Sequence, residues 1–155
     1  MDGNRGTITL HNNCQFPLYV EGVAGVSYLK TELQPETNIS DPFRLTINGT
    51  GNSVKVATYD GSSDITQIEY SACFQNDRHI NCHPSNMIFY DISKINGLSN
   101  TGYGIRIVPS LQGCATVDCP SGVEKCDMVY YHPHDDYATK ACDVRADLNV
   151  EFCAA

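Results

Sequence analysis

Apolar and polar residues alternate in short stretches along most of this chain, and turn-forming residues separate the stretches. An apolar side chain at every second position is typical of a strand with one buried face, because successive strand side chains point to opposite faces of a sheet. No segment of a dozen residues carries the i, i+3, i+4, i+7 apolar stripe of a helix. The pattern therefore predicts an all-β fold, with at most a short helical turn after Asp91. Strands are expected at residues 7–10, 17–20, 43–47, 54–59, 65–70, 87–92, 104–108 and 148–152.

Many short strands linked by Gly, Asn and Pro turns are typical of a sandwich of two packed sheets. We therefore expect one antiparallel β-sandwich domain over residues 1–155. The chain has no Trp, so Tyr and Phe must supply its largest buried surfaces. Alternation predicts a core made of these apolar residues: Ile8, Leu10, Leu18, Val20, Leu45, Ile47, Val54, Val56, Ile105, Ile107, Val150 and Phe152. The polar residues between them are expected to face solvent: Lys55, Arg106, Asn149 and Glu151.

The formal net charge is -8, and the acidic residues are spread along the chain. A negative surface disfavours nucleic acid, whose phosphates require stripes of Lys and Arg, and it disfavours anionic lipid as well. It permits neutral polyhydroxyl or cationic partners, although it also fits a surface that only keeps the protein soluble. No apolar run approaches the length of a membrane span. We expect a monomer with no nucleic-acid or membrane partner.

Eight cysteines extend from Cys14 near the start of the chain to Cys153 near its end. Such a set indicates a disulfide framework, which persists in oxidising compartments, so secretion is expected. The first residues are polar and lack the apolar region of a signal peptide, so we expect a leader to have been removed and Met1 to be an added start. Sequons at Asn38 and Asn48 are predicted glycosylation sites that fit this route. Spacing alone leaves the cysteine pairing open.

Five segments, in order along the chain, resemble motifs of the thaumatin-like proteins. Residues 9–20, which contain His-Asn-Asn-Cys-Gln-Phe-Pro-Leu-Tyr-Val, resemble the family's opening V-x-N-N-C-x-(F/Y)-x-(V/I)-(W/Y). Residues 89–98 resemble its central Y-D-(V/I)-S-x-(V/I)-D-G-F. Residues 111–119 contain a similar G-C-x-x-x-x-C step, residues 126–142 contain Tyr-Tyr-His-Pro-His-Asp-Asp like the family's Y-S-Y-x-x-D-D, and residues 150–153 match the closing V-x-F-C.

The chain also departs from the family pattern. The T-(G/A)-D-C signature is not recognisable, and the long cysteine-rich second domain is missing between Cys119 and Cys126. With Tyr19 in place of Trp and few cysteines, the chain most resembles the small fungal antigenic, yeast-phase-specific branch, and small plant members are the alternative. The resemblance therefore implies a disulfide-stapled thaumatin-like sandwich without the second domain.

The resemblance also implies a cysteine pairing: Cys14–Cys153, Cys114–Cys142 and Cys119–Cys126, with Cys73–Cys82 as the remaining pair closing a short hairpin loop. The first of these bonds closes a loop of nearly the whole chain. A loop of that length stabilises a fold by on the order of 4–5 kcal/mol in the chain-entropy account.

An acidic cleft between the sandwich and its loops is a further implication of the resemblance. Asp91 matches one cleft aspartate, Asp135 or Asp136 matches another, and Asn96 stands where a third is usual. An aspartate such as Asp91 can instead accept hydrogen bonds from nearby backbone N–H groups and fix a turn.

The family's cleft also contains an Arg and a Glu, which have no secure counterparts here; Arg106 and Glu69 are the candidates to lie near. Glycoside hydrolysis normally requires two carboxylates on either side of the scissile bond. Asp91 with Asp135 or Asp136 meets that requirement only if the fold brings them within roughly 5–10 Å.

Polysaccharide binding uses the same acidic groups together with aromatic rings and demands less geometry, and Tyr131 is the ring assigned to the cleft. Other exposed rings are expected either to stack on sugars or to pack in the core: Tyr103, Tyr130 and Tyr137.

The His132-Pro133-His134-Asp135-Asp136 run is metal-like in composition, but a metal site needs three or four converging ligands, and a solvated loop is the competing interpretation. We expect no metal and no cofactor. We also expect no cysteine nucleophile, because all eight cysteines pair.

The leading hypothesis is therefore a secreted recognition protein of the cell wall or cell surface that binds β-glucan-type polysaccharide without catalysis. Two alternatives stay open: an effector or antigen that binds a host protein, and a weak endo-β-1,3-glucanase that uses Asp91, Asp135 and Asp136.

Overall fold

The structure, a computed structural model, describes residues 5–44, 51–73, 86–95, 103–123, 126–135 and 138–154. These residues form twelve strands and no α-helix, and none of their segments is a helix that could cross a membrane. The strands are β1 (Thr7–Asn12), β2 (Leu18–Val23), β3 (Ser27–Leu33), β4 (Thr37–Pro42), β5 (Asn52–Ala57), β6 (Thr66–Cys73), β7 (Met87–Ser93), β8 (Ile105–Pro109), β9 (Val117–Cys119), β10 (Val129–Tyr130), β11 (Lys140–Asp143) and β12 (Leu148–Phe152).

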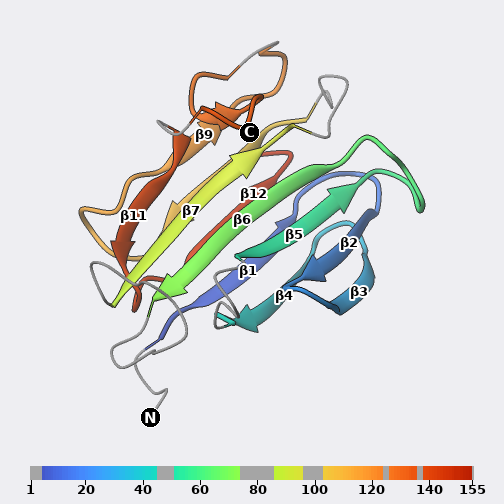
Figure 1. Cartoon of the computed structure of the whole chain (residues 1–155). Helices are drawn as coiled ribbons and strands as arrows, with labels where there is room; N and C mark the ends of the chain where they lie inside the picture. The colour runs from blue at the N-terminus through green and yellow to red at the C-terminus, as the bar shows by residue number, and fades with distance from the viewer. Residues whose placement is uncertain are drawn as a thin grey trace.

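Two sheets make up the sandwich (Figure 1). The five-stranded sheet has the order β4-β1-β12-β8-β9. The seven-stranded sheet has the order β10-β7-β6-β5-β2-β3, and β11 also pairs with β7. Pairing is antiparallel except for β1 with β12 and β10 with β7. The first and last strands thus lie side by side, with Ile8 opposite Leu148 and Asn12 opposite Phe152.

The core lies between the sheets and contains the apolar residues that alternation predicts. Ten of the twelve predicted core residues are buried, and the other two, Leu45 and Ile47, lie outside the described residues. The largest fully buried side chains include Tyr70, Tyr90 and Phe43. This confirms that Tyr and Phe take the place of Trp in the core. The predicted solvent-facing residues do point outward, but neighbouring strands leave them half-buried: Lys55, Arg106, Asn149 and Glu151.

The prediction of a strand at residues 43–47 is wrong for residues 43 and 44, which are the part of it that the structure describes. β4 ends at Pro42, and Phe43 follows it outside any strand, with its ring buried in the core and its N–H donating to the Gly6 carbonyl at 3.1 Å. The sequence also gives little sign of β3 and β4, which are the edge strands of their sheets. Edge strands carry more polar side chains than central ones, so their alternation is weak. β7 continues past Asp91 to Ser93, so the helical turn expected after Asp91 is not present up to Ile95, and residues 96–100 lie outside the described part of the chain.

Three disulfides staple the described residues: Cys14–Cys153, Cys114–Cys142 and Cys119–Cys126, with Cα–Cα distances of 5.0, 5.4 and 5.5 Å. They are three of the four pairings that the family resemblance implies. Cys73 is disulfide-bonded as well, but Cys82 lies outside the described residues. The Cys14–Cys153 bond joins the loop after β1 to the end of β12, so it fastens covalently the two strands that pair at the centre of the five-stranded sheet.

Candidate functional site

Two carboxylates lie side by side on the outer face of the seven-stranded sheet. Alternation along β6 and β7 turns the buried side chains Ile68, Tyr70 and Tyr90 inward, so Glu69 and Asp91 between them turn outward. The register of β6 against β7 places Glu69 directly opposite Asp91. Side chains in such positions have Cβ atoms about 4.5–5.5 Å apart. Glu69, which the sequence offers only as a nearby candidate, is thus the partner of Asp91.

The pKa values of both acids are raised in the folded protein. Burial, and to a lesser degree the neighbouring charge of Glu69, raises the pKa of Asp91 from its ordinary 3.8 to about 7. Burial also raises the pKa of Glu69, while a hydrogen bond with Ser93 lowers it. The Oδ1 atom of Asp91 is buried and has no hydrogen-bond partner among the described residues. A buried polar atom without a partner is unusual, and a ligand group is one way to satisfy it.

A polar recess of about 210 Å³ opens at this pair. Its lining comes from the start of β5, from β6 and β7, and from the residue before β11: Gly51, Asn52, Glu69, Tyr70, Ser71, Phe89, Asp91 and Thr139. The recess is smaller than the roughly 300 Å³ of a typical small-molecule pocket. It therefore suits one polar group or the edge of one sugar ring rather than a whole ligand.

Asp135 has the backbone role that the sequence allowed for Asp91. Its Oδ2 atom accepts hydrogen bonds from the N–H groups of Tyr131 and His132, both at 3.0 Å. Its own N–H donates to the His132 carbonyl at 3.1 Å, which closes the turn. Asp135 is not among the described residues that line the recess. Asp136 and Asn96, the other predicted cleft residues, lie outside the described residues.

The predicted aromatic platforms need correction. Tyr103 and Tyr130 are only 5% and 9% exposed, so neither presents a ring to solvent. Tyr103 packs instead between Phe16 and Phe152, at centroid distances of 6.1 and 6.3 Å. Tyr131 is half-buried, and its hydroxyl accepts a hydrogen bond from the Cys126 N–H at 2.9 Å. Tyr137 lies outside the described residues.

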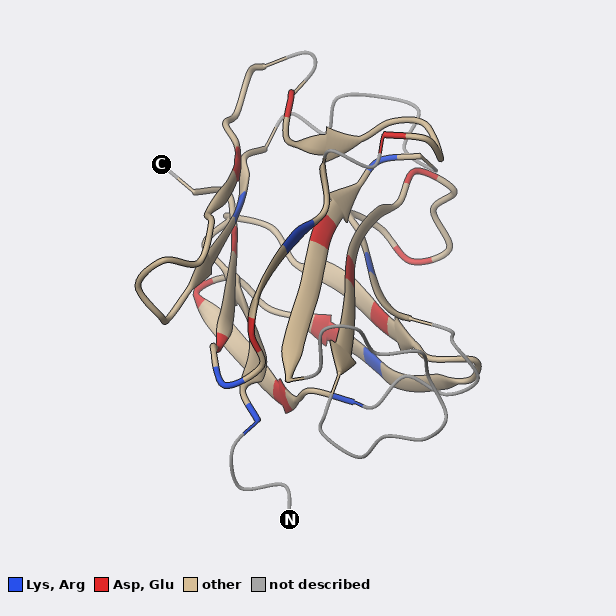
Figure 2. Ribbon diagram, turned by 60° about the vertical axis from the view of Figure 1, so that its left-hand side comes forward, with Lys and Arg blue, Asp and Glu red and all other residues tan. Residues whose placement is uncertain are grey.

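Arg106 does not approach Asp91. It lies on β8, on the outer face of the other sheet, where its guanidinium is 3.4 Å from Asp118 and 3.5 Å from Glu151. Figure 2 shows that acidic residues lie on strands of both sheets. The recess therefore contains two carboxylates, and none of its described lining residues is Arg or Lys.

The other predicted sites are isolated. His132 and His134 are exposed loop residues, and the described residues contain no group of three His, Cys, Asp or Glu side chains that could hold a metal ion. Asn38 is exposed on β4, which leaves its glycosylation a prediction, and Asn48 lies outside the described residues.

Comparisons with known proteins agree with this architecture. The chain is 36% identical over 154 residues to an antigenic thaumatin-like protein from Arthroderma benhamiae, covering 98% of this chain and 73% of the relative. It is 28% identical over 146 residues to the secreted thaumatin-like protein calA from Emericella nidulans, covering 91% of this chain and 77% of the relative.

Solved structures show the same fold at low sequence identity. The protein elicitor MoHrip2 from Magnaporthe oryzae superposes with a TM-score of 0.73 at 23% identity, covering 96% of this chain and 99% of that one. The thaumatin-like xylanase inhibitor TLXI superposes with a TM-score of 0.61 at 13% identity, covering 95% and 99%. Residues 4–154 match the family described as Blastomyces yeast-phase-specific protein. The chain therefore belongs to this family and is a small fungal thaumatin-like protein.

Proposed function

We propose that this protein is a secreted, noncatalytic recognition protein of the cell wall or cell surface, and that its Glu69–Asp91 recess binds β-glucan-type polysaccharide. The observation that carries this proposal is the unpartnered, buried Oδ1 atom of Asp91 beside a second carboxylate in a polar recess. The disulfide framework and the secreted relative support export from the cell.

The paired acids suit a sugar hydroxyl, which both donates and accepts hydrogen bonds. Near neutral pH the Asp91 carboxyl is protonated in part, because its pKa is about 7. The protonated acid donates a hydrogen bond and its neighbour Glu69 accepts one. A pair of this kind therefore matches the two roles of one hydroxyl in a neutral polysaccharide.

The test is retention on insoluble β-1,3-glucan, reversed by a soluble β-1,3-linked oligosaccharide. Glu69→Ala and Asp91→Ala are each expected to weaken retention about tenfold, the effect of leaving one buried hydrogen bond unmade. Asp127→Ala is the matched control, because Asp127 is exposed in the turn before β10 and does not line the recess. Retention that is unchanged in both recess variants would rule out this site.

A weak endo-β-1,3-glucanase is the second candidate, favoured by the raised pKa of Asp91 beside a carboxylate, a combination that glycosidases use. Glu69 and Asp91 lie side by side on one sheet face, however, whereas the two carboxylates of a glycosidase lie on either side of the scissile bond. Release of reducing ends that disappears in Asp91→Ala would support hydrolysis and overturn the noncatalytic assignment.

Contact with a host protein is the third candidate. It is favoured by the name of the Arthroderma benhamiae relative, an antigenic protein, and by the description of MoHrip2 as an elicitor. Capture of one defined host protein, by a chain that does not retain on glucan, would favour this function over polysaccharide recognition.

A further inference from the structure

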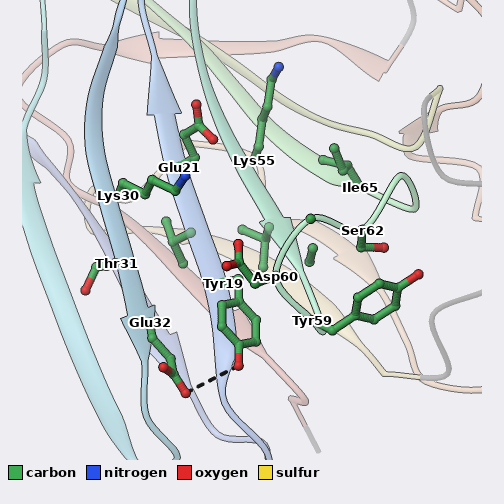
Figure 3. Close-up of a pocket in the computed structure, with 14 residues that line it drawn as sticks. Tyr19, Glu21, Lys30, Thr31, Glu32, Lys55, Tyr59, Asp60, Ser62 and Ile65 are labelled. Carbon is green, nitrogen blue, oxygen red and sulfur yellow. Dashed lines mark hydrogen bonds between the residues drawn. The ribbon is translucent and has the colours of Figure 1, made fainter.

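A second and larger hollow lies on the same outer face of the seven-stranded sheet, toward its β3 edge. It has a volume of about 370 Å³, and β2, β3, β5 and the loop at residues 59–62 line it. Figure 3 shows its polar side chains rising from the strands on one side and from this loop on the other. No described residue lines both this hollow, called the Tyr59 groove below, and the recess at Asp91.

Opposite charges alternate across the floor of the Tyr59 groove. The strand register places Glu21 of β2 between Lys30 of β3 and Lys55 of β5. Within the part of the chain that the structure describes, none of these three side chains forms an ion pair. Their carboxylate and ammonium groups are therefore open to a ligand. A row of alternating acceptors and donors matches the adjacent hydroxyls of a sugar, each of which donates and accepts.

Two tyrosines border this charged row. Tyr59 is 60% exposed, and Figure 3 shows its ring projecting from the loop at one end of the groove. Tyr19 lies on the sheet with its hydroxyl 3.5 Å from the Glu32 carboxylate. Glu32, above all, and Asp60 raise the pKa of Tyr19, so its hydroxyl stays protonated as a donor. Exposed rings beside polar groups bind ligands that have both apolar and polar faces, and a pyranose ring is such a ligand.

We propose that the Tyr59 groove is a second saccharide site, in which a neutral hexose ring stacks on Tyr59 and its hydroxyls bond to the Lys30–Glu21–Lys55 row. The charges of the groove favour a neutral ligand, because its three acids (Glu21, Glu32 and Asp60) nearly balance its two lysines. The choice of β-glucan as the ligand of this site rests on the proposed function.

Position also links the groove to the recess. From β2 to β7 there are three strand spacings of about 4.8 Å, and Tyr19 and Glu69 pair with positions on β5 that are four residues apart. The two sites are therefore roughly 20 Å apart on one face. A long polysaccharide chain can bind both at once, which strengthens retention without any new contact.

The experiment is a titration of the isotope-labelled full chain with a β-1,3-linked glucose hexamer, followed by the NMR shifts of backbone amides. We expect shifts at residues 19–21 and 55–62 as well as near Glu69 and Asp91. Tyr59→Ala is expected to weaken binding at the groove roughly three- to tenfold, and Tyr59→Phe, which keeps the ring, to leave it unchanged. Asp91→Ala should abolish the shifts at the recess and preserve those at the groove.

Each outcome separates this inference from the proposed function. Shifts confined to the recess overturn the second site and leave the proposed function standing. Shifts confined to the groove support the second site and overturn the assignment of the recess. No shift at either place at millimolar hexamer overturns both. Stronger shifts at the groove with a tetralysine peptide than with the hexamer overturn the saccharide assignment in favour of a cationic ligand.

Discussion

The two outer faces of this sandwich use charge in different ways. On the five-stranded sheet, Arg106 lies 3.4 Å from Asp118 and 3.5 Å from Glu151, so one guanidinium links three neighbouring strands. The hydroxyls of Thr9 and Ser40 hydrogen-bond across the β1–β4 pair at 2.7 Å. The polar groups on this face satisfy one another, and their role is to support the sheet.

The seven-stranded sheet leaves more of its polar groups available. Asp91 keeps a buried oxygen without a partner, and Lys30, Glu21 and Lys55 alternate without forming ion pairs within the described residues. Both the recess and the Tyr59 groove open on this face. The buried Asp91 oxygen lowers the stability of the fold unless something binds it, whereas water solvates the charges of the groove and leaves them available to a ligand. The contrast indicates that one sheet supports the domain and the other meets the ligand.

The largest effect is expected on the supporting sheet, from loss of the bond between its first and last strands. The double variant Cys14→Ala/Cys153→Ala is expected to lose about 4–5 kcal/mol of stability, because the unfolded chain regains the freedom of a loop that spans nearly its whole length. For a chain of this size that corresponds to a fall in Tm on the order of 10–20 °C, measured by thermal unfolding without reductant.

A short-loop disulfide is the control for that experiment. Cys119→Ala/Cys126→Ala removes a bond with a sequence separation of only 7, and is expected to cost about 2–3 kcal/mol. A shift of one or two degrees in the first variant, or a larger shift in the control, would show that the terminal strands do not depend on their covalent link.

The fold follows from local pattern to a large extent. Alternation around Val54, Ile105 and Val150 identifies strands, because the face to which a strand side chain points is set by its position within that strand alone. The cysteine pairing came from the motifs around Cys14, Cys114 and Cys153, which spacing alone leaves undecided. The edge strands β3 and β4 escaped prediction because their polar side chains blur the alternation that a buried face creates.

The candidate site was harder to predict from the sequence than the fold was. Alternation over residues 65–70 already puts Glu69 on the outer face, but its position opposite Asp91 depends on the register of two strands. Register is a property of the folded sheet, not of either segment. Asp91 and Asp135 were likewise interchangeable as acidic residues, and only their hydrogen bonds show that Asp135 fixes a turn while Asp91 keeps a free oxygen.

The second prediction concerns the pH dependence of stability at Asp91. Its pKa is about 7 in the folded protein, against an ordinary value of 3.8, so between these values the folded state holds a proton that the unfolded state releases. The contribution of Asp91 to the free energy of unfolding is therefore fully present below about pH 4 and is lost as pH rises through 7. The loss amounts to about a few kcal/mol at most. Urea unfolding at intervals from pH 4 to pH 8 measures this loss.

Asp91→Ala is the control, because it removes the titrating group. The variant is preferred to Asp91→Asn, which would make residues 91–93 read Asn-Ile-Ser, a glycosylation sequon. Carboxylates whose pKa is lowered, such as Asp143 beside Arg145, change stability in the opposite direction but are present in both proteins and cancel in the difference. Equal pH slopes for the two proteins would show that Asp91 ionises normally.

The third prediction separates Asp135 from Asp91. Asp135→Ala removes the acceptor for two backbone N–H groups and is expected to lower the free energy of unfolding by about 1–2 kcal/mol. Asp135→Asn keeps one side-chain oxygen as an acceptor and should cost less. Urea unfolding and retention on glucan are measured together. Weaker glucan retention in Asp135→Asn at unchanged stability would place this residue in the ligand site after all.

The smallest effect is expected for Arg106, and it tests the division between the two faces most directly. Arg106→Ala breaks two ion pairs between partly exposed side chains, which together contribute about 0.2–1 kcal/mol after screening by solvent. Raising the salt concentration should shrink the difference from the unmodified protein, since exposed pairs are screened. Glucan retention should stay the same, because Arg106 lies on the opposite face from the recess. If Arg106→Ala weakens retention as strongly as Glu69→Ala does, the ligand contacts both faces, and the assignment of support to one sheet and recognition to the other is wrong.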